Sequence, residues 1–394
     1  LEPIDYSIIS TKLIHEMFYY EKMFYLSVDR ISFNPISHLE KSRLYYLFLS
    51  YYYKFILESN TDTFIFNNMP HGLPQIVLFG LAKYMKFKTI IIDYPGISPL
   101  YSLIRKDIHP REKLDSNINY ENEKYLNDFI ESLKRTNLPW TKGIHKNINL
   151  VLKFDRYKML IRRIMSLLFI KPFSKYTHPA FFLNRSSRKK ITYVIPFIKY
   201  FYKREKYINY YKKKAVIKNK SHFDKKFITF FLHYDPESIT LPQAGIFADQ
   251  LMTFNLIEKS LPADTFLYVK EHWSMNTSLT DDLAMDKHFR SMDFYKKINA
   301  SNKVKLVDQN VSSSELIQKS DHVISINGTV AWECLRSGKP AIIFGWNWYS
   351  ECESCFVADS SSSLKNIYDI SKNKNKNEVI KDVDLFLNRF SKKL

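Results

Sequence analysis

The spacing of apolar residues predicts that the chain begins with helices. Over residues 1–60, apolar side chains recur at intervals of three and four, the period of one face of an α-helix. The residues that show this spacing are Ile14, Phe18, Leu44, Leu47, Tyr51 and Phe55. We therefore expect mostly helix in this part of the chain, with one strand near residues 23–28.

From residue 63 onward, short apolar runs alternate with segments of helical spacing. In the first half, strands are predicted at 63–66 and 89–92 around a helix at 73–85, with a further helix at 120–135. The second half predicts strands at 226–233, 265–270, 304–307, 322–326 and 340–344, and helices at about 245–260, 313–320, 329–337 and 379–391. Strands that alternate with helices in this way form parallel sheets. The predicted fold class is α/β, with two Rossmann-like domains.

Composition agrees with a folded protein of two domains. The 394 residues are 45% hydrophobic, with 27 Tyr, 30 Phe and 8 Gly, which excludes collagen-like and disordered chains. Three cysteines cannot form a disulfide framework, and the C-x-x-C pair at 352–355 lacks the second pair of a zinc site. No His, Cys and carboxylate set has metal-ligand spacing, so we expect neither a metal nor another cofactor.

The positive charge of the chain is concentrated in one segment. The net charge is +19, and residues 151–220 carry 20 Lys and Arg against 2 Asp and Glu, a net of +18. We place the domain boundary after this segment, giving domains 1–220 and 221–394. Lysine and arginine interleaved with Phe, Tyr and Ile favour an anionic membrane surface as the partner, ahead of an anionic acceptor or a nucleic acid. The sequence shows neither a membrane-spanning run nor a signal peptide, so a cytoplasmic protein is expected.

Unusual polar residues follow four of the five predicted strands in the second half. Ligands of open parallel sheets bind at the carboxyl ends of the strands, so these residues predict one binding site. The candidates are Asp235, Glu237, Asp249, Gln250, Lys270, Glu271, His272, Asn327, Gly328, Thr329, Glu333 and Tyr349. In the first half, His71 follows a strand and opens a helix in the same way.

The types of these residues point to a phosphate. Gly328 lets the backbone approach a ligand, and a helix that starts at Thr329 presents N–H groups and a positive dipole end. Lys270 and His272 alternate onto one side of their strand, where both could contact a phosphate oxygen. His272 could also donate a proton or a hydrogen bond to a departing phosphate. A helix N-cap and a solvated loop are the plain structural alternatives. The carboxylates suit proton transfer or nucleophilic attack, or else a helix start and a solvated helix face. No P-loop and no G-x-G-x-x-G is present.

Taken in order, these motifs resemble the bacterial capsule polysaccharide biosynthesis family that contains β-Kdo glycosyltransferases. The resemblance covers roughly residues 61–95 and 226–357. It rests on Asn68-Met69-Pro70-His71, Leu81-Ala82-Lys83, Leu232-His233-Tyr234-Asp235-Pro236-Glu237, Ala248-Asp249-Gln250, Leu261-Pro262, Leu267-Tyr268-Val269-Lys270-Glu271-His272, Asn327-Gly328-Thr329-Val330-Ala331-Trp332-Glu333, Gly338-Lys339-Pro340, Phe344-Gly345 and Trp348-Tyr349. The chain departs from the family pattern at Trp273, Asp235 and Asn327, where proline, Gln and Thr or Ser are usual.

The resemblance implies a GT-B architecture, with two Rossmann-like domains facing across a cleft and the last helix crossing back to the first domain. It implies a metal-independent transferase that takes Kdo or a nonulosonic acid from a CMP-activated donor, with a retaining outcome in the β-Kdo type. Lys270, His272, Gly328 and Thr329 would hold the CMP phosphate, and the acceptor would be a capsule or lipopolysaccharide glycan or glycolipid at the inner face of the bacterial inner membrane. A sialyltransferase-like or UDP-sugar-dependent transferase is the alternative, and a non-enzymatic RNA-binding protein ranks below both.

The resemblance also assigns the remaining candidate residues. Asp235, Glu237, Asp249 and His71 would lie on the acceptor and sugar side of the cleft. The other residues of the donor site would be Glu271, Asn327, Glu333, Gln250 and Tyr349.

Overall fold

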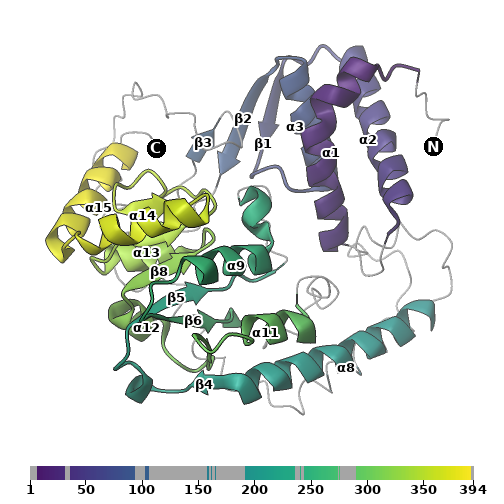
Figure 1. Ribbon diagram of the computed structural model, residues 1–394. Coiled ribbons are helices and arrows are strands. Elements are labelled where there is room, and N and C mark those ends of the chain that lie inside the picture. Colours follow the sequence, from purple (N-terminus) through teal and green to yellow (C-terminus); the bar gives the residue numbers. More distant parts are fainter. Residues whose placement is uncertain are drawn as a thin grey trace. The chain divides into compact units, whose positions relative to one another are not determined.

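The computed structural model describes residues 7–31, 36–93, 103–105, 158, 161, 165, 191–235, 240, 244–273, 275 and 290–391. Contacts divide the chain into two compact units (Figure 1). The first comprises Leu1–Glu123, Leu241–Gln243 and Arg389–Leu394, and the second Lys124–Thr240 and Ala244–Asn388. No helix among the described residues is both long enough and apolar enough to cross a bilayer.

The first unit packs helices with a small sheet. Its elements are α1 (Thr11–Ile31), α2 (His38–Glu58), β1 (Thr63–Phe66), α3 (Leu73–Tyr84), β2 (Lys88–Asp93) and β3 (Leu103–Arg105). Strand β2 lies between β1, which is parallel to it, and β3, which is antiparallel. The predicted strands at 63–66 and 89–92 and the helices are thereby confirmed. The strand near residues 23–28 is wrong, because Phe24 and Val28 lie one helical turn apart on the buried face of α1.

The period of the first helices was predicted correctly, but not which side faces the core. Phe18, Tyr51 and Phe55 are exposed, whereas Met17 and Leu49 are buried. Aromatic residues occur on both sides of α1 and α2, so apolar spacing alone did not identify the core side.

The second unit is built on a seven-stranded parallel sheet. Its strands are β4 (Ala215–Ile217), β5 (Phe227–Phe231), β6 (Phe266–Lys270), β7 (Val304–Val307), β8 (His322–Ser325), β9 (Ala341–Ile343) and β10 (Cys355–Val357), in the order β10-β9-β8-β5-β6-β7-β4. Successive strands from β5 to β7 are added on one side, and those from β8 to β10 on the other. The topology therefore switches between the adjacent strands β5 and β8, the place where open α/β sheets bind ligands.

Helices and short 3₁₀ turns connect these strands. They are α8 (Ile191–Lys214), η2 (Lys220–His222), η3 (Gly245–Ala248), α9 (Gln250–Ser260), α11 (Met292–Ile298), α12 (Ser313–Lys319), α13 (Thr329–Arg336), α14 (Ser361–Lys372) and α15 (Lys376–Ser391). All five predicted strands and four predicted helices of this half are present, and the α/β class with parallel sheets is confirmed. Strands β4 and β10 and helices α8, α11 and α14 were not predicted.

The boundary expected near residue 221 falls inside the second unit. Strand β4 pairs with β7, and the Tyr211 hydroxyl of α8 donates to the carbonyl of Val307. The high charge of segment 151–220 led us to place it outside the second domain. Its many lysines dominate the composition, although one face of α8 is apolar and buried. The predicted helix at 120–135 and residues 151–190, apart from 158, 161 and 165, lie outside the described residues. In α15, Phe386 packs on Trp332 and Trp348 of the second unit; the crossing to the first domain stays a prediction.

Close packing of α3 on α1 predicts that Gly80→Ala destabilises the first unit. A Cβ at Gly80 would lie 2.7 Å from Met17 Cε and from the Tyr20 ring. Overpacking of this kind costs about 1–3 kcal/mol, which exceeds the roughly 1 kcal/mol that alanine gains in helix propensity. Urea unfolding, with hydrogen exchange of α1 and α3, measures the loss.

Gly72→Ala is the matched control, since its Cβ would meet only the flexible side chain of Gln75, at 3.2 Å. A Gly80→Ala protein as stable as the wild type would contradict the packing of α1 on α3.

Candidate active site at the switch between β5 and β8

A buried histidine joins the ends of the two strands at the switch point. His233 follows β5, and its Nε2 lies 3.1 Å from the hydroxyl of Ser325, the last residue of β8. The same nitrogen accepts from the backbone N–H of Asn327 at 3.2 Å. Burial lowers the pKa of His233 to about 3, so the ring is neutral at pH 7 and can accept hydrogen bonds through Nε2.

Helix α13 begins directly at this junction. Gly328 is its N-cap residue in an extended conformation and provides no capping side chain. A Cβ at Gly328 would lie 3.0 Å from both His233 Nε2 and Ser325 Oγ, so close approach requires glycine here. No side chain of Gly328 caps the first turn of α13, which includes the N–H groups of Thr329 and Val330. A helix start of this kind suits an anion.

The loop after β9 braces the same helix start from the other side. The Asn347 side chain donates to the carbonyl of Asn327 at 2.5 Å, and the Tyr349 hydroxyl donates to the carbonyl of Gly328 at 2.5 Å. The Asn327 amide donates in turn to the Trp346 carbonyl at 3.3 Å. Asn327 and Tyr349 are both fully buried, so in this structure they hold the backbone of the site. A direct contact of either with the donor stays a prediction.

One arginine ties the loops after β5 and β6 together. Arg290 Nη1 lies 2.7 Å from Asp235 Oδ2, and its Nε lies 2.7 Å from Glu271 Oε2. Its Nη2 donates to the His233 carbonyl at 2.8 Å and to Glu271 Oε1 at 3.1 Å. Tyr295 of α11 donates to Glu271 Oε2 at 2.6 Å. The guanidinium is thus the counter-charge that Asp235 and Glu271 share.

Gln250 completes this polar cluster. Its Oε1 accepts from the His233 N–H at 2.8 Å, and its Nε2 donates to the His233 carbonyl at 3.2 Å and to Asp235. Burial raises the pKa of Asp235 to about 6, against the opposing effect of Arg290. The two acidic groups raise the pKa of Arg290 well above its ordinary value, although burial opposes this rise. Asp235, Gln250 and Glu271 therefore form the support beneath the site.

Lys270 and His272 have different surroundings. Lys270 is buried, and its ammonium donates to the carbonyls of Gln309 and Val311 in the loop after β7, with its pKa lowered by burial to about 8. In this structure Lys270 therefore holds a loop, and a phosphate contact stays a prediction. His272 is half-buried between the rings of Tyr234 and Trp273, with centroids 5.8 and 5.7 Å away. Burial lowers the pKa of His272 to about 4.

The remaining candidates are spread more widely. Asp249 is exposed and caps α9, accepting from the N–H groups of Leu251 and Met252 at 3.0 and 3.2 Å. Glu333 is half-buried on α13, and burial raises its pKa. His71 lies in the first unit, where its Nδ1 is 2.7 Å from the Met69 carbonyl. Glu237 lies outside the described residues.

The described residues contain no group of three or more His, Cys, Asp or Glu that could hold a metal ion. The three cysteines are buried, and burial raises the pKa of Cys334 to about 12 and of Cys352 to about 11. These thiols are protonated at pH 7, so the C-x-x-C pair is better explained as structural than as redox-active.

Sequence reasoning missed Arg290, Tyr295 and the role of His233. Arg290 follows no predicted strand and belongs to no motif, so nothing in its immediate sequence marked it. The available signal was indirect, since two carboxylates at the ends of adjacent buried strands require a counter-charge.

A family model provides the decisive comparison. The model of the capsule polysaccharide biosynthesis proteins matches residues 119–352 of the chain. The chain belongs to this family. The match includes every element of the site in the second unit, from β5 to Tyr349, and confirms the family expected from the motifs. No curated protein matches the chain.

Several solved structures are similar to this capsule-family chain at low sequence identity. UDP-GlcNAc 2-epimerase from Methanocaldococcus jannaschii, in complex with UDP-GlcNAc and UDP, is 14% identical over 88% of this chain and 77% of its own, with a TM-score of 0.29. The wall teichoic acid polymerase TagF is 12% identical over 97% and 94%, with a TM-score of 0.28. S. aureus MnaA with UDP is 11% identical over 91% and 77%, with a TM-score of 0.26. Likenesses this distant carry no argument about activity.

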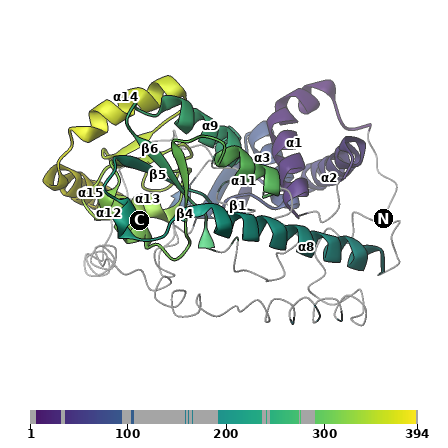
Figure 2. The same cartoon turned by 60° about the horizontal axis from the view of Figure 1, so that its bottom comes forward.

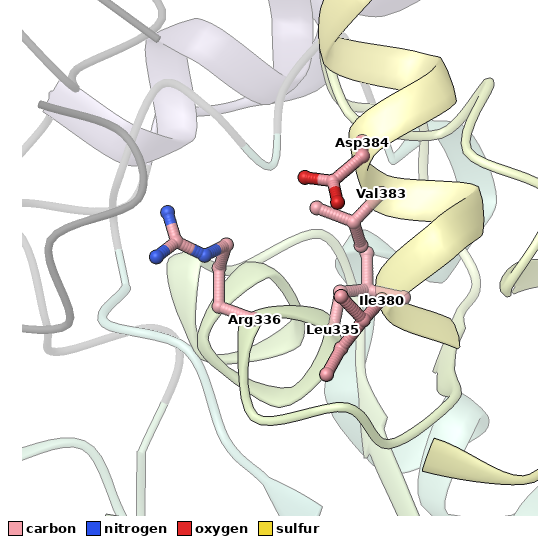
Figure 3. A pocket seen from close by; sticks show the side chains of 5 residues that line it. All are labelled: Leu335, Arg336, Ile380, Val383 and Asp384. Atoms are coloured by element: carbon pink, nitrogen blue, oxygen red, sulfur yellow. The ribbon is translucent and has the colours of Figure 1, made fainter. Parts of the chain in front are cut away.

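A pocket of about 290 Å³ lies at the other end of α13. Leu335 and Arg336 from the last turn of that helix line it, together with Ile380, Val383 and Asp384 of α15 (Figure 3). None of the candidate residues lines this pocket. This pocket is therefore separate from the start of α13, where His233, Ser325 and Gly328 meet.

The buried ion cluster predicts a large loss of stability on replacing Arg290. Arg290→Met leaves Asp235 and Glu271 buried without their counter-charge, which should cost about 3–5 kcal/mol. Arg290→Lys should fall between the two proteins, because an ammonium lacks the guanidinium fork that reaches both carboxylates. Urea unfolding measures both variants.

Arg389→Met, on the exposed side of α15, is the control for loss of one arginine. If Arg290→Met unfolds at the same urea concentration as the wild type, the proposed cluster is not what holds these loops.

The neutral state of His233 predicts a specific pH dependence of stability. In the unfolded chain His233 has its ordinary pKa of 6.5, whereas in the folded protein its pKa is about 3. The wild type therefore loses stability as pH falls from 7 to 5, and His233→Gln should lose about 2 kcal/mol less over that interval. The glutamine can still offer an acceptor at the position of Nε2.

Free energies of unfolding at pH 7 and 5 test this expectation, with the exposed His222→Gln as the matched control. Equal pH dependence in wild type and His233→Gln would show that His233 is not held neutral by the fold.

Proposed function

We propose that this capsule-family chain is a glycosyltransferase that moves an acidic 2-keto sugar, Kdo or a nonulosonic acid, from a CMP-activated donor to a capsule or lipopolysaccharide glycan or glycolipid. The observation that carries the proposal is the start of α13 at the switch between β5 and β8. It offers N–H groups without a side-chain cap, and it lies at the switch point of the parallel sheet. A sugar phosphate of a nucleotide donor fits both features.

The leaving group of the proposed reaction is CMP, whose phosphate gains charge as the glycosidic bond to the sugar breaks. The N–H groups and positive dipole end of α13 would stabilise that charge, so the proposed chemistry uses no metal. His272 would contribute a hydrogen bond from its neutral ring, since burial lowers its pKa to about 4. A bound phosphate next to the ring would raise this pKa and favour protonation.

The carboxylates divide into supporting and reacting groups in this proposal. Asp235 accepts from Arg290 and Gln250, and Asp249 caps α9, so both have structural bonds. We therefore assign proton transfer or nucleophilic attack to Glu237, two residues after Asp235, with His71 on the acceptor side. For segment 151–220 the proposed partner is an anionic membrane surface.

A panel of donors tests the activity directly. CMP-Kdo, CMP-sialic acid, CMP-pseudaminic acid and UDP-sugars are compared by melting shift and by nucleotide release. We expect a CMP-sugar to raise the melting temperature and to release CMP in the presence of acceptor. A response to UDP-sugars and to no CMP-sugar would establish the alternative donor class and refute the proposed one.

Filling the start of α13 predicts loss of nucleotide binding. The Cβ of Gly328→Ala would press on His233 and Ser325 and displace the helix start, so we expect at least a tenfold weaker donor affinity by calorimetry. Val330→Ala, at a half-buried position of the same turn, keeps the backbone N–H; it is the matched control and should bind as the wild type does. Unchanged affinity in a folded Gly328→Ala protein would rule out this helix start as the phosphate site.

A further inference from the structure

Helix α8 has one face in the core of the second unit and one in solvent. Phe201, Tyr207, Ile208 and Tyr211 are buried. Tyr207 and Tyr211 pack on Tyr295 of α11, with ring centroids 5.9 and 5.3 Å away. The helix is therefore fixed to the unit along this side, and Figure 2 shows it as one long helix whose last turn leads into β4.

The opposite side of α8 is formed by lysines with apolar residues among them. Lys199, Lys203, Lys206 and Lys213 are exposed, and their spacing of four, three and seven places them on one helical stripe. Ile195 and Tyr202 lie on the same stripe and are 54% and 52% exposed. We call these six residues the lysine face.

The lysine face carries positive charge without a neighbouring acid on its helix. The single acidic residue of α8, Glu205, is buried, as is Arg204, whose guanidinium donates to the Met275 carbonyl at 2.6 Å. The fold thus separates the charges of this helix, placing the arginine and glutamate inside and the lysines outside. Two large apolar side chains also belong to this exposed stripe, Tyr202 among the lysines and Ile195 at its start.

We propose that the lysine face is a docking surface for an anionic phospholipid bilayer. Lysine ammonium groups would lie among the lipid phosphates, and Ile195 and Tyr202 would enter the headgroup region between them. An amphipathic helix that lies flat on a membrane has this composition, with basic residues flanking apolar ones. The rigid attachment of α8 to the sheet would then set the orientation of the second unit on the bilayer.

The composition of the face favours lipid over nucleic acid. Lysine is a compact, strongly hydrated point charge that suits a diffuse anionic surface, whereas arginine is preferred where phosphates are bound in a fixed geometry. Arg204, the arginine of this helix, is buried, and the aliphatic side chain of Ile195 is exposed. Tight binding of RNA is therefore an outcome that the test must exclude.

This inference extends the membrane part of the proposed function and is independent of the donor. Vesicle binding can fail while a CMP-sugar still shifts the melting temperature, and the reverse can also occur. The two measurements, made on the same 394-residue protein, therefore separate a failure of the surface from a failure of the activity.

Flotation with vesicles tests the surface. Vesicles of phosphatidylcholine with about one quarter phosphatidylglycerol are compared with pure phosphatidylcholine, at low and high salt. We expect binding to the anionic vesicles that weakens as salt screens the charges. Replacing Lys199, Lys203 and Lys206 together by Gln should weaken it roughly 100-fold, since each lysine near an anionic surface contributes about fivefold.

The matched control removes the same charge from elsewhere on the unit, by replacing the exposed Lys319, Lys365 and Lys372 with Gln. It should retain most of the binding, and Tyr202→Ser should weaken it without a change in charge. Equal loss in the two triple variants would show that only net charge matters. Full binding by the lysine-face variant, absence of binding by the wild type, or displacement from vesicles by RNA would each overturn the proposal.

Discussion

The polar core of the second unit depends on one guanidinium buried between two carboxylates. Removing Arg290, Asp235 and Glu271 from water is costly, and their attraction compensates only because almost every donor of the arginine has an acceptor. Asp235 follows β5, Glu271 follows β6 and Arg290 precedes α11. The cluster therefore holds three separate loops together at one edge of the sheet. The Glu271 carboxylate also accepts from the His272 N–H at 2.7 Å, which fixes the backbone of His272, a candidate for contact with the donor.

Above this cluster the site is built from neutral groups. His233 is held by Gln250 and Arg290 through its backbone and by Ser325 and Asn327 through its ring, so it transmits the order of the ion cluster to the start of α13. The cations nearest to the sequence motif have structural partners: Arg290 pairs with carboxylates and Lys270 with carbonyls. In the proposed donor site, the positive potential that the described residues offer a phosphate would therefore come mainly from backbone N–H groups, which do not titrate and whose position the fold determines.

The sequence predicted the helices and strands, whose signal is local. It missed the contacts between residues that lie far apart in the chain. Apolar runs identified β5 to β9, and the residues that follow them were correctly gathered at one sheet edge. Strand alternation also placed Lys270 near that edge, but it could not show that the carbonyls of Gln309 and Val311 lie within its reach. Arg290 lies 19 residues from Glu271 and 55 from Asp235, so its role emerges only from tertiary packing. Asp249 shows the reverse case: the structure gives this carboxylate a role as the cap of α9, and its catalytic role stays a prediction.

The charge composition suggested a domain boundary after residue 220, whereas the contacts place segment 151–220 in the second unit. The reason is physical. Segment 151–220 has a net charge of +18, yet Tyr207, Ile208 and Tyr211 within it belong to the core of the second unit. Composition averages over all sides of a helix, whereas a folded helix meets the protein on one side and solvent on the other. On α8 this difference separates apolar residues that fix the helix from lysines that cannot contribute to the core. Stability needs only the first set. The acid-free lysine stripe beside exposed Ile195 and Tyr202 is therefore available to an external partner, and the proposed anionic bilayer fits both residue types.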